Sequence, residues 1–540
     1  MSGFGALLAQ RLRRDRMQVP LWAVGTALLA YLSYVGVAQS YGTEADREAL
    51  LSTVMANRVI LLFRGLPSGA DDGAFMLFLI LPFLVMMAAF MSTFLAVRHT
   101  RADEESGRAE LVGATAAGRL TPLAATAAHG LIAGAILAAL TTLAYLAVGL
   151  PVTGSLIAGC ATGAAGLTFL GVGLVMGQLF RTPRAANAAS VWIVLLTYLI
   201  AGIGSALGTP TSDLQRLESS WLVWLSPFGW AEQSRPFADD AGWPVVLCAL
   251  VGLALVGLAF ALQSVRDLGS SFVAERSGRP AARPALASPM ALVWRLNTGA
   301  LIGWAIGGLL TGMLATSLSA PLQETAASLP SVEAILTALS AGGSLEEGAV
   351  VIFFTMLGIL AACCAVQVIC RARQEETHGT AEIVLAAPVD RARWLADYVV
   401  VAFAGIVIVV ASAVVGALLG IASLDDPDWS LMTDVLVTGG GQVAAASVFL
   451  VITALVFVLA PRLTIPLGWT LVMVGMILGL FGPLFGFPDW LVNLAPIGVA
   501  PTMTSDGVDL KGLWWLLLAV AVGATATLSL MRRRELAADG

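Results

Sequence analysis

Charge is scarce in this sequence. Charged residues make up 12% of its 540 residues, about half of the roughly 25% found in soluble globular domains. Hydrophobic residues reach 58%, and the mean hydropathy is +0.87. This composition excludes an ordinary soluble protein and predicts a membrane protein, and we expect no nucleic-acid partner.

Cysteine is also rare, and its placement indicates no disulfide framework. All five cysteines fall within or at the ends of apolar runs, where a thiol behaves as a small core hydrophobe. We therefore expect no metal site in this chain. The five are Cys160, Cys248, Cys363, Cys364 and Cys370.

Lysine is nearly absent, which excludes an ATPase site. A P-loop needs a lysine after its glycines to reach the nucleotide phosphates, and Lys511 is the only lysine here. The chain is therefore not expected to be an enzyme or to hold a cofactor of its own. Any ATP-driven role requires a separate ATPase subunit that binds ATP and Mg²⁺.

Ionisable groups at membrane depth are missing as well. Such groups are energetically costly, and transporters that use ion gradients retain them for function. His129, near the start of the third apolar run, is the one titratable exception. Two interpretations of it stay open: a histidine hydrogen-bonded inside the helix bundle, or part of a proton relay.

What the sequence does have is long apolar runs. Each is near or above the ~20 residues that span a ~30 Å hydrocarbon core. The fold class we predict is an all-α polytopic membrane protein of about twelve transmembrane helices. The runs lie near residues 20–38, 74–97, 123–149, 154–179, 189–207, 243–262, 298–318, 348–370, 398–420, 435–460, 464–487 and 512–531.

The basic residues between the runs fix an orientation. With a cytoplasmic N-terminus, 23 of the 29 basic residues fall in inner segments and six in outer ones. By the positive-inside rule, both termini are predicted to be cytoplasmic. We expect a multi-pass protein of the bacterial inner (plasma) membrane.

The chain contains an internal repeat with a period of about 270 residues. The loop after the second run reads Arg101-Ala-Asp-Glu104-Glu105, the loop after the eighth reads Arg371-Ala-Arg-Gln-Glu375, and one inserted residue aligns the two. Further matches pair Leu225-Ser-Pro227-Phe-Gly229 with Leu494-Ala-Pro496-Ile-Gly498, and Arg266-Asp267-Leu268 with Arg534-Glu535-Leu536.

The repeat predicts two six-helix halves, residues 1–270 and 290–540, joined by a cytoplasmic linker at 271–289. Six spans are an even number, so both halves enter the membrane the same way round and form parallel repeats. Each half opens with apolar residues at helical spacing, which predicts an interfacial elbow helix before the first span, within residues 1–19 in the first half. These residues are Phe4, Leu7, Leu8 and Leu12, then Met290, Val293, Trp294 and Leu296.

The duplicated cytoplasmic loops, 98–122 and 371–397, are the strongest local signal. A single such loop would be interpreted as a solvated connector whose acids balance its arginines. Because the Glu-Glu, Gly and Ala-Glu elements recur at the same topological place, we favour a docking role. Carboxylates in such loops give a protein interface specificity and register.

Carrying these loops, the chain resembles the fused, two-half permeases of the ABC-2 exporter superfamily, in particular the actinobacterial kind associated with polyketide-antibiotic (tetronasin-type) efflux. The resemblance covers the whole chain. It implies an elbow helix, six spans and a coupling helix in each half, with the coupling helices inserted into ATPase subunits.

The resemblance also implies partners and site residues. The partners would be two copies of a P-loop ATPase or two different ATPases, membrane lipids, and a hydrophobic or amphipathic substrate such as a drug, an antibiotic or a lipid-like molecule. The alternative is an ion-coupled secondary drug transporter of the twelve-helix type, which shares the topology. The implied ATPase-coupling residues are Glu104, Glu105, Gly107, Arg108, Glu110, Glu375, Glu376, Gly379, Glu382 and Arg391.

Overall fold

The computed structural model divides into two compact units, Met1–Ser277 (unit 1) and Gly278–Gly540 (unit 2). Most of the predicted linker at 271–289, and Lys511, lie outside the residues that it describes. The described residues are 3–56, 58–115, 117–273, 288–318, 345–424, 427–482, 488–504, 507–510 and 512–534.

Within the described residues, twelve helices are long and apolar enough to cross a membrane. The prediction of an all-α polytopic membrane protein is confirmed. The main helices are α2 (Gln18–Ser40), α5 (Asp72–Arg98), α8 (Thr121–Ala147), α9 (Val152–Leu179), α10 (Pro183–Ala206) and α12 (Trp243–Val265) in unit 1, and α13 (Pro289–Ser317), α16 (Leu345–Thr377), α18 (Arg391–Ala422), α19 (Leu431–Leu459), α20 (Thr464–Met476) and α22 (Leu513–Met531) in unit 2.

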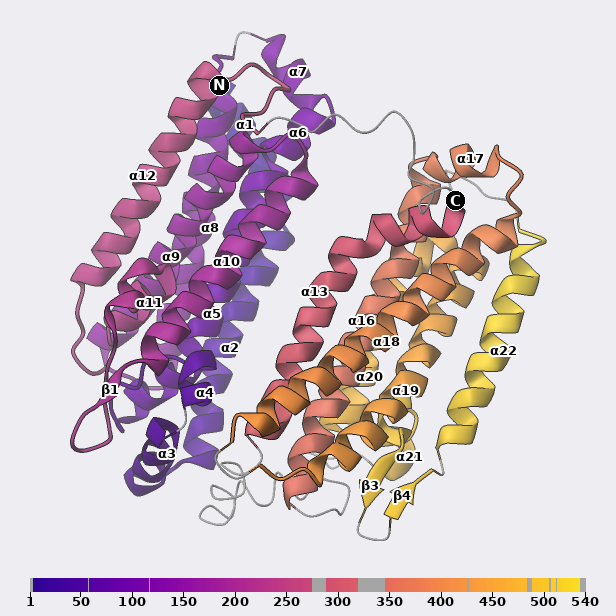
Figure 1. Cartoon of the computed structure of the whole chain (residues 1–540). Coiled ribbons are helices and arrows are strands. Elements are labelled where there is room, and N and C mark those ends of the chain that lie inside the picture. Colours follow the sequence, from indigo (N-terminus) through magenta and orange to yellow (C-terminus); the bar gives the residue numbers. More distant parts are fainter. Residues whose placement is uncertain are drawn as a thin grey trace. The chain divides into compact units, whose positions relative to one another are not determined.

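Unit 1 begins with a short amphipathic helix. This helix, α1 (Gly3–Arg14), ends at a turn before α2 and packs against α8. The short helices α6 (Arg101–Glu105) and α7 (Arg108–Gly113) follow α5 at the same end of the unit, as Figure 1 shows. The elbow and the duplicated loop are therefore neighbours.

The opposite end of unit 1 carries small elements that close the bundle. The helices α3 (Glu44–Ala56) and α4 (Arg58–Phe63) precede α5. A two-residue strand β1 (Thr209–Pro210) pairs antiparallel with β2 (Leu217–Glu218). The 3₁₀ turn η1 (Trp221–Leu225) and helix α11 (Pro227–Gln233) then pack against the spans α9, α10 and α12.

Unit 2 does not form the separate elbow helix that the sequence predicts. Residues Met290 to Leu296 do not form a separate helix, because α13 runs without a break from Pro289 to Ser317. The Ser288 side chain accepts a hydrogen bond from the Ala291 backbone and caps this single helix. In this half Asn297 alone separates Leu296 from the apolar run that begins at Thr298.

The duplicated loop of unit 2 follows α16, where α17 (Thr380–Leu385) takes the place of α7. At the other end of the unit (Figure 1), β3 (Thr502–Thr504) pairs antiparallel with β4 (Gly507–Asp509). The remaining short elements of unit 2 are η3 (Pro461–Leu463), η4 (Ile477–Phe481), α21 (Asp489–Val492) and η5 (Pro496–Val499).

Glycines bring the first and third spans of unit 2 into close contact. A Cβ atom on Gly308 or Gly312 would overlap the backbone of α18, and one on Gly416 would overlap the backbone of α13. Small residues at such crossings let helices approach closely where hydrocarbon supplies no hydrophobic drive. By contrast, only 11% of the apolar window of α22 is buried.

Candidate functional site

The two duplicated loops share one backbone geometry. Gly107 precedes α7 with φ 72°, and Gly379 precedes α17 with φ 71°. This left-handed conformation strains any residue that has a Cβ atom. Each glycine therefore lets the chain turn sharply out of the preceding helix and begin the short one.

In unit 1, Glu104 is held between two arginines. Its Oε2 atom lies 2.7 Å from Nη1 of Arg101 and 3.0 Å from Nη1 of Arg266, and its Oε1 atom pairs with Nη2 of Arg266. The Glu104 side chain is only 9% exposed. Arg266 follows α12, so the pair ties the loop after α5 to the end of the sixth span.

Unit 2 repeats this Arg–Glu–Arg clamp. Glu376 accepts a 3.0 Å hydrogen bond from Nη1 of Arg373 and pairs with Nη2 of Arg534, which follows α22. The Glu376 side chain is 1% exposed. The loop of each half is thus fastened to the end of the last span of that half.

The clamps correct the alignment of the repeat. Arg101, Glu104 and Gly107 correspond to residues 272 positions later, Arg373, Glu376 and Gly379. The loops therefore need no inserted residue, and pairing Arg101 with Arg371 was wrong. Arginines stand at both 371 and 373, and only the three-residue spacing between arginine and glutamate identifies Arg373 as the counterpart of Arg101.

Several residues that the sequence assigned to coupling make contacts within their own half. Arg108 Nη1 lies 3.1 Å from Asp103, and Arg391 donates to the Arg534 carbonyl at 2.8 Å. Glu375 pairs with Arg371 at 2.7 Å. Glu105, Glu110 and Glu382 are exposed instead.

The short helices each expose one large apolar side chain at a matched position. Leu111 on α7 is 73% exposed, and Ile383 on α17 is 75% exposed. They stand 272 positions apart, next to the exposed Glu110 and Glu382. The sequence-based prediction considered only the charged residues of these loops and did not include Leu111 and Ile383, although both recur at the same place in the repeat.

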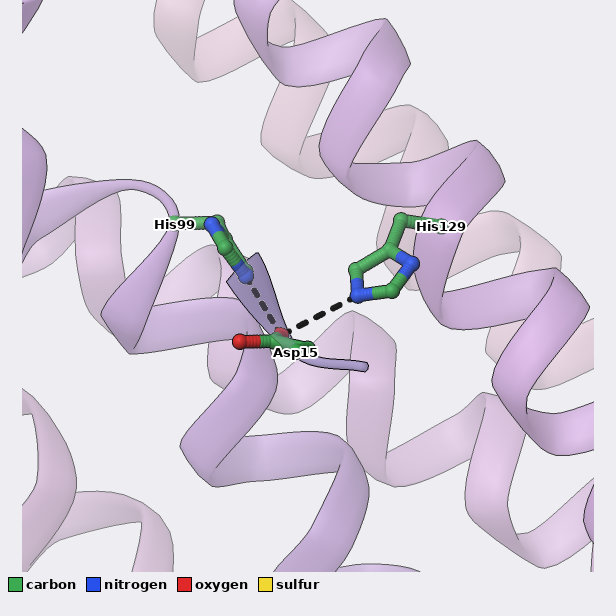
Figure 2. A group of neighbouring side chains, drawn as sticks. All are labelled: Asp15, His99 and His129. Carbon is green, nitrogen blue, oxygen red and sulfur yellow. Dashed lines mark hydrogen bonds and ion pairs between the residues drawn. The ribbon is translucent and has the colours of Figure 1, made fainter. Parts of the chain in front are cut away.

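Unit 1 also contains a buried histidine cluster that the sequence did not predict as a group. Asp15 lies between α1 and α2, His99 follows α5, and His129 lies on α8. The Nε2 atoms of His99 and His129 lie 2.6 and 3.1 Å from the same Asp15 oxygen, Oδ2. Figure 2 shows both rings converging on this carboxylate. The hydrogen-bonded interpretation of His129 is the one found.

The environment keeps the Asp15 carboxylate ionised. Burial alone would raise the pKa of Asp15, but hydrogen bonds from His129 and His99 and the charge of Arg98 lower it far below its ordinary value. Arg98 Nη1 lies 3.3 Å from the second carboxylate oxygen, Oδ1. The cluster therefore fastens the elbow to α5 and α8 with charge-assisted hydrogen bonds.

The donor set of this cluster also resembles a metal site. Its three ligand atoms lie within 4.8 Å of one another, and two imidazoles with a carboxylate suit first-row transition metals. Arg98 already neutralises Asp15, however, and neither Nδ1 atom has a hydrogen-bond partner in the described part of the chain. Metal-bound histidines usually donate that second N–H, so the geometry favours a hydrogen-bonded network.

Comparison with known proteins shows the family to which the chain belongs. The family model described as the C-terminal domain of the multidrug efflux system permease Rv1217c matches residues 5–262 and 286–532. The chain is also 34% identical over 543 residues to the multidrug efflux system permease protein Rv1217c of Mycobacterium tuberculosis, covering 99% of this chain and 95% of that protein. The chain therefore belongs to this family of efflux permeases and is the membrane-spanning permease subunit of an ABC exporter.

Proposed function

We propose that the exposed faces of α7 and α17 are the docking surfaces for separate P-loop ATPase subunits. The observation that carries this is the matched pair Leu111 and Ile383, which expose 73% and 75% of their surface beside a glutamate. An exposed apolar anchor with a charged neighbour is a common arrangement at an interface, where the anchor fills a pocket and the charge sets register.

In this proposal the sequence-predicted residues divide into two roles. Glu105, Glu110 and Glu382 are exposed and touch the ATPase. Glu104 and Glu376 are positioning residues, because their carboxylates are occupied by arginines of the same half. A movement of a coupling helix is then passed through the clamp to the last span of the same half. A conformational change of the transporter requires contacts that differ between its two states, and the clamp links the ATPase to such contacts.

The partners follow from the family resemblance. We propose two ATPase subunits, either two copies of one chain or two different chains, which bind ATP and Mg²⁺ because this permease carries no P-loop. Both termini face the cytoplasm of a bacterial plasma membrane. The substrates are hydrophobic or amphipathic compounds, including drugs, in keeping with the relative's name, and the chain is an ABC-2 permease of the tetronasin-efflux kind.

Affinity purification tests the docking surfaces. The tagged permease is isolated from its native membranes in mild detergent, and co-purifying P-loop ATPase is measured by mass spectrometry. Replacing Leu111→Arg and Ile383→Arg together is expected to lower the recovered ATPase at least tenfold, since hot-spot residues carry about 2 kcal/mol or more.

The matched control is Leu120→Arg, an exposed leucine of the same loop that lies outside α7. It should leave ATPase recovery close to wild type. Full recovery in the double variant, or an equal loss in the control, would contradict docking through α7 and α17. Absence of any ATPase with the wild-type permease would contradict the proposed partner itself.

A further inference from the structure

A cavity of about 340 Å³ opens in unit 1 beneath the elbow helix. Residues of α1, the α6–α7 loop and the start of α8 line it. The first residue of α1 reaches the loop after α7, where a Cβ on Gly3 would lie 3.7 Å from Ala117. The cavity therefore lies between α1 and α7, and Leu111 of the proposed docking surface also lines it.

The polar side of this cavity carries an excess of positive charge. Four arginines line it, Arg11, Arg14, Arg108 and Arg119, against two carboxylates, Asp103 and Glu104. Both carboxylates are already engaged: Asp103 Oδ1 lies 2.7 Å from Arg14 and 3.1 Å from Arg108, and Glu104 is held in its clamp. Arg119 lies 3.9 Å from Asp267, so Arg11 is the lining arginine without a carboxylate partner among the described residues.

Arg11 is the group that most lacks a partner. It is only 6% exposed, and its one hydrogen bond in the described structure runs from Nη2 to the His99 carbonyl at 3.3 Å. Its Nε and Nη1 atoms have no partner among the described residues. Burial lowers the pKa of Arg11 to about 10, so the side chain is still charged at neutral pH. A buried cation with unmet donors is strongly destabilising unless an anion binds it.

The rest of the lining is apolar. Leu7, Val112, Leu123 and Leu268 face the same cavity. The helix above it, α1, is amphipathic and exposes Phe4 and Leu12, as expected for a helix that lies in the membrane interface. A ligand that fits both sides carries an anionic group for Arg11 and an apolar part for the leucines.

We propose that this cavity binds the phosphate group of an anionic phospholipid of the adjoining leaflet, with Arg11 as its principal ligand. Arginine forms charge-assisted hydrogen bonds with phosphate oxygens, and Arg11 has donors without a partner among the described residues. The bound headgroup lies against the wall that carries α7, so the lipid stabilises the position of the coupling helix. The site needs no ATPase, and it is tested on the permease alone.

Lipid retention in native mass spectrometry tests the site. The permease is placed in phosphatidylcholine nanodiscs with about one lipid in five phosphatidylglycerol, then released in the mass spectrometer, and its bound lipids are identified. Wild type should retain phosphatidylglycerol. The Arg11→Gln variant should retain about tenfold less, the effect of losing a charge-assisted hydrogen bond.

Arg13→Gln is the matched control, because Arg13 is an exposed arginine of the same helix that does not line the cavity. It should retain phosphatidylglycerol like wild type. A second variant, Ala109→Trp, fills the cavity while keeping Arg11, and it should also lose the lipid. It keeps the test decisive if Arg11→Gln fails to fold.

Three outcomes would overturn the proposal. Equal losses in the Arg11 and Arg13 variants would mean general surface attraction. Stabilisation of the phosphatidylcholine-reconstituted permease by inorganic phosphate as strong as that by phosphatidylglycerol would assign the site to a soluble anion. Unchanged lipid retention with lost ATPase recovery in Arg11→Gln would assign it to a protein carboxylate instead.

Discussion

The clamp behind each coupling helix is the same in both units, but its supports differ. In unit 1, Arg266 donates to Gln178 of α9 at 2.8 Å. In unit 2, the guanidinium of Arg534 lies 4.7 Å from the centre of the Phe457 ring of α19. One arginine is held by a polar partner and the other by a cation–π contact.

The side chains packed around the two clamps also differ, being polar in unit 1 and aromatic in unit 2. Unit 1 packs Asp15, His99 and His129 behind its loop, whereas Val401 stands in unit 2 where unit 1 has His129. Unit 2 instead buries Trp394 in contact with both Tyr398 and Phe457. The duplicated chain thus retains the clamp while the groups around it differ, which indicates that the clamp serves a need common to both halves.

The far ends of the two units differ as well. Unit 1 has Pro227, Gly229 and then the buried Glu232, whereas unit 2 has Pro496, Gly498 and then Pro501 at the corresponding place. Burial raises the pKa of Glu232 to about 8. Here too, the titratable group occurs in one half and not in the other.

The largest expected effect comes from removing a clamp glutamate. Glu376→Ala and Glu104→Ala each leave two arginines without their shared anion, which destabilises a buried ion-pair group by about 3 to 5 kcal/mol. Because Glu376 is 1% exposed and Glu104 is 9% exposed, the unit 2 variant should melt lower. Thermal unfolding in detergent measures this.

The exposed Glu105 is the control for that pair, and Glu105→Ala should melt like wild type. If Glu104→Ala and Glu376→Ala also melted like wild type, the two clamps would not be structural. If only one of them did, the clamp would not be a need common to both halves.

A smaller effect, which depends on pH, is expected from Glu232→Gln. The folded-state pKa of Glu232 lies above its ordinary value, so its proton is retained in the folded state and lost from the unfolded state. Wild-type stability should therefore fall as pH rises from about 4.5 to about 8 and level off above. The variant lacks this fall and should gain up to about 3 kcal/mol on wild type by pH 7.

Melting temperatures of both proteins from pH 5 to pH 9 provide the measurement. The two curves should nearly meet at the acid end and separate towards neutrality. Parallel curves would mean that Glu232 is ionised in the fold and that the far ends of the two units differ less than the sequence suggests.

The histidine cluster should give the third effect. Asp15→Asn removes the anion shared by both histidines and Arg98, and it should destabilise the protein by about 2 kcal/mol. His129→Val, which installs the residue of the second half, removes a single hydrogen bond and should lower stability by about 1 kcal/mol. Differential scanning fluorimetry separates the two.

Added Zn²⁺ serves as the control for this cluster. Zn²⁺ should not raise the melting temperature of wild type above that of Asp15→Asn, because the cluster is held by hydrogen bonds. A zinc-dependent rise confined to wild type would mean that the three side chains ligate a metal.

The smallest expected effect comes from substituting the two loop glycines, one in each unit. Gly107→Ala and Gly379→Ala place a Cβ at nearly the same positive φ, with open space around it in both cases. Each should destabilise its loop by about 1 kcal/mol, and the two values should agree. Hydrogen exchange of the α7 and α17 amides is the readout, and unequal values would mean that the two turns are not equivalent.

Much of this fold could be predicted from the sequence, because hydrocarbon demands long apolar helices and leaves little freedom in their length. The clamps could not, since Arg266 stands 162 residues from Glu104 and Arg534 stands 158 from Glu376. The repeat did mark both arginines after the last spans, without indicating what they bind. The histidine cluster had no such marker, because Asp15 is 84 and 114 residues from its two partners.

The clamps also set an order of events during synthesis. In each half the glutamate leaves the ribosome roughly 160 residues before the arginine that follows the sixth span. A coupling helix is therefore unanchored while the four intervening spans are being inserted, and it is secured when the last span of its half has entered the bilayer. Under the proposed docking of ATPase subunits to α7 and α17, an unfinished half therefore offers them no anchored docking helix.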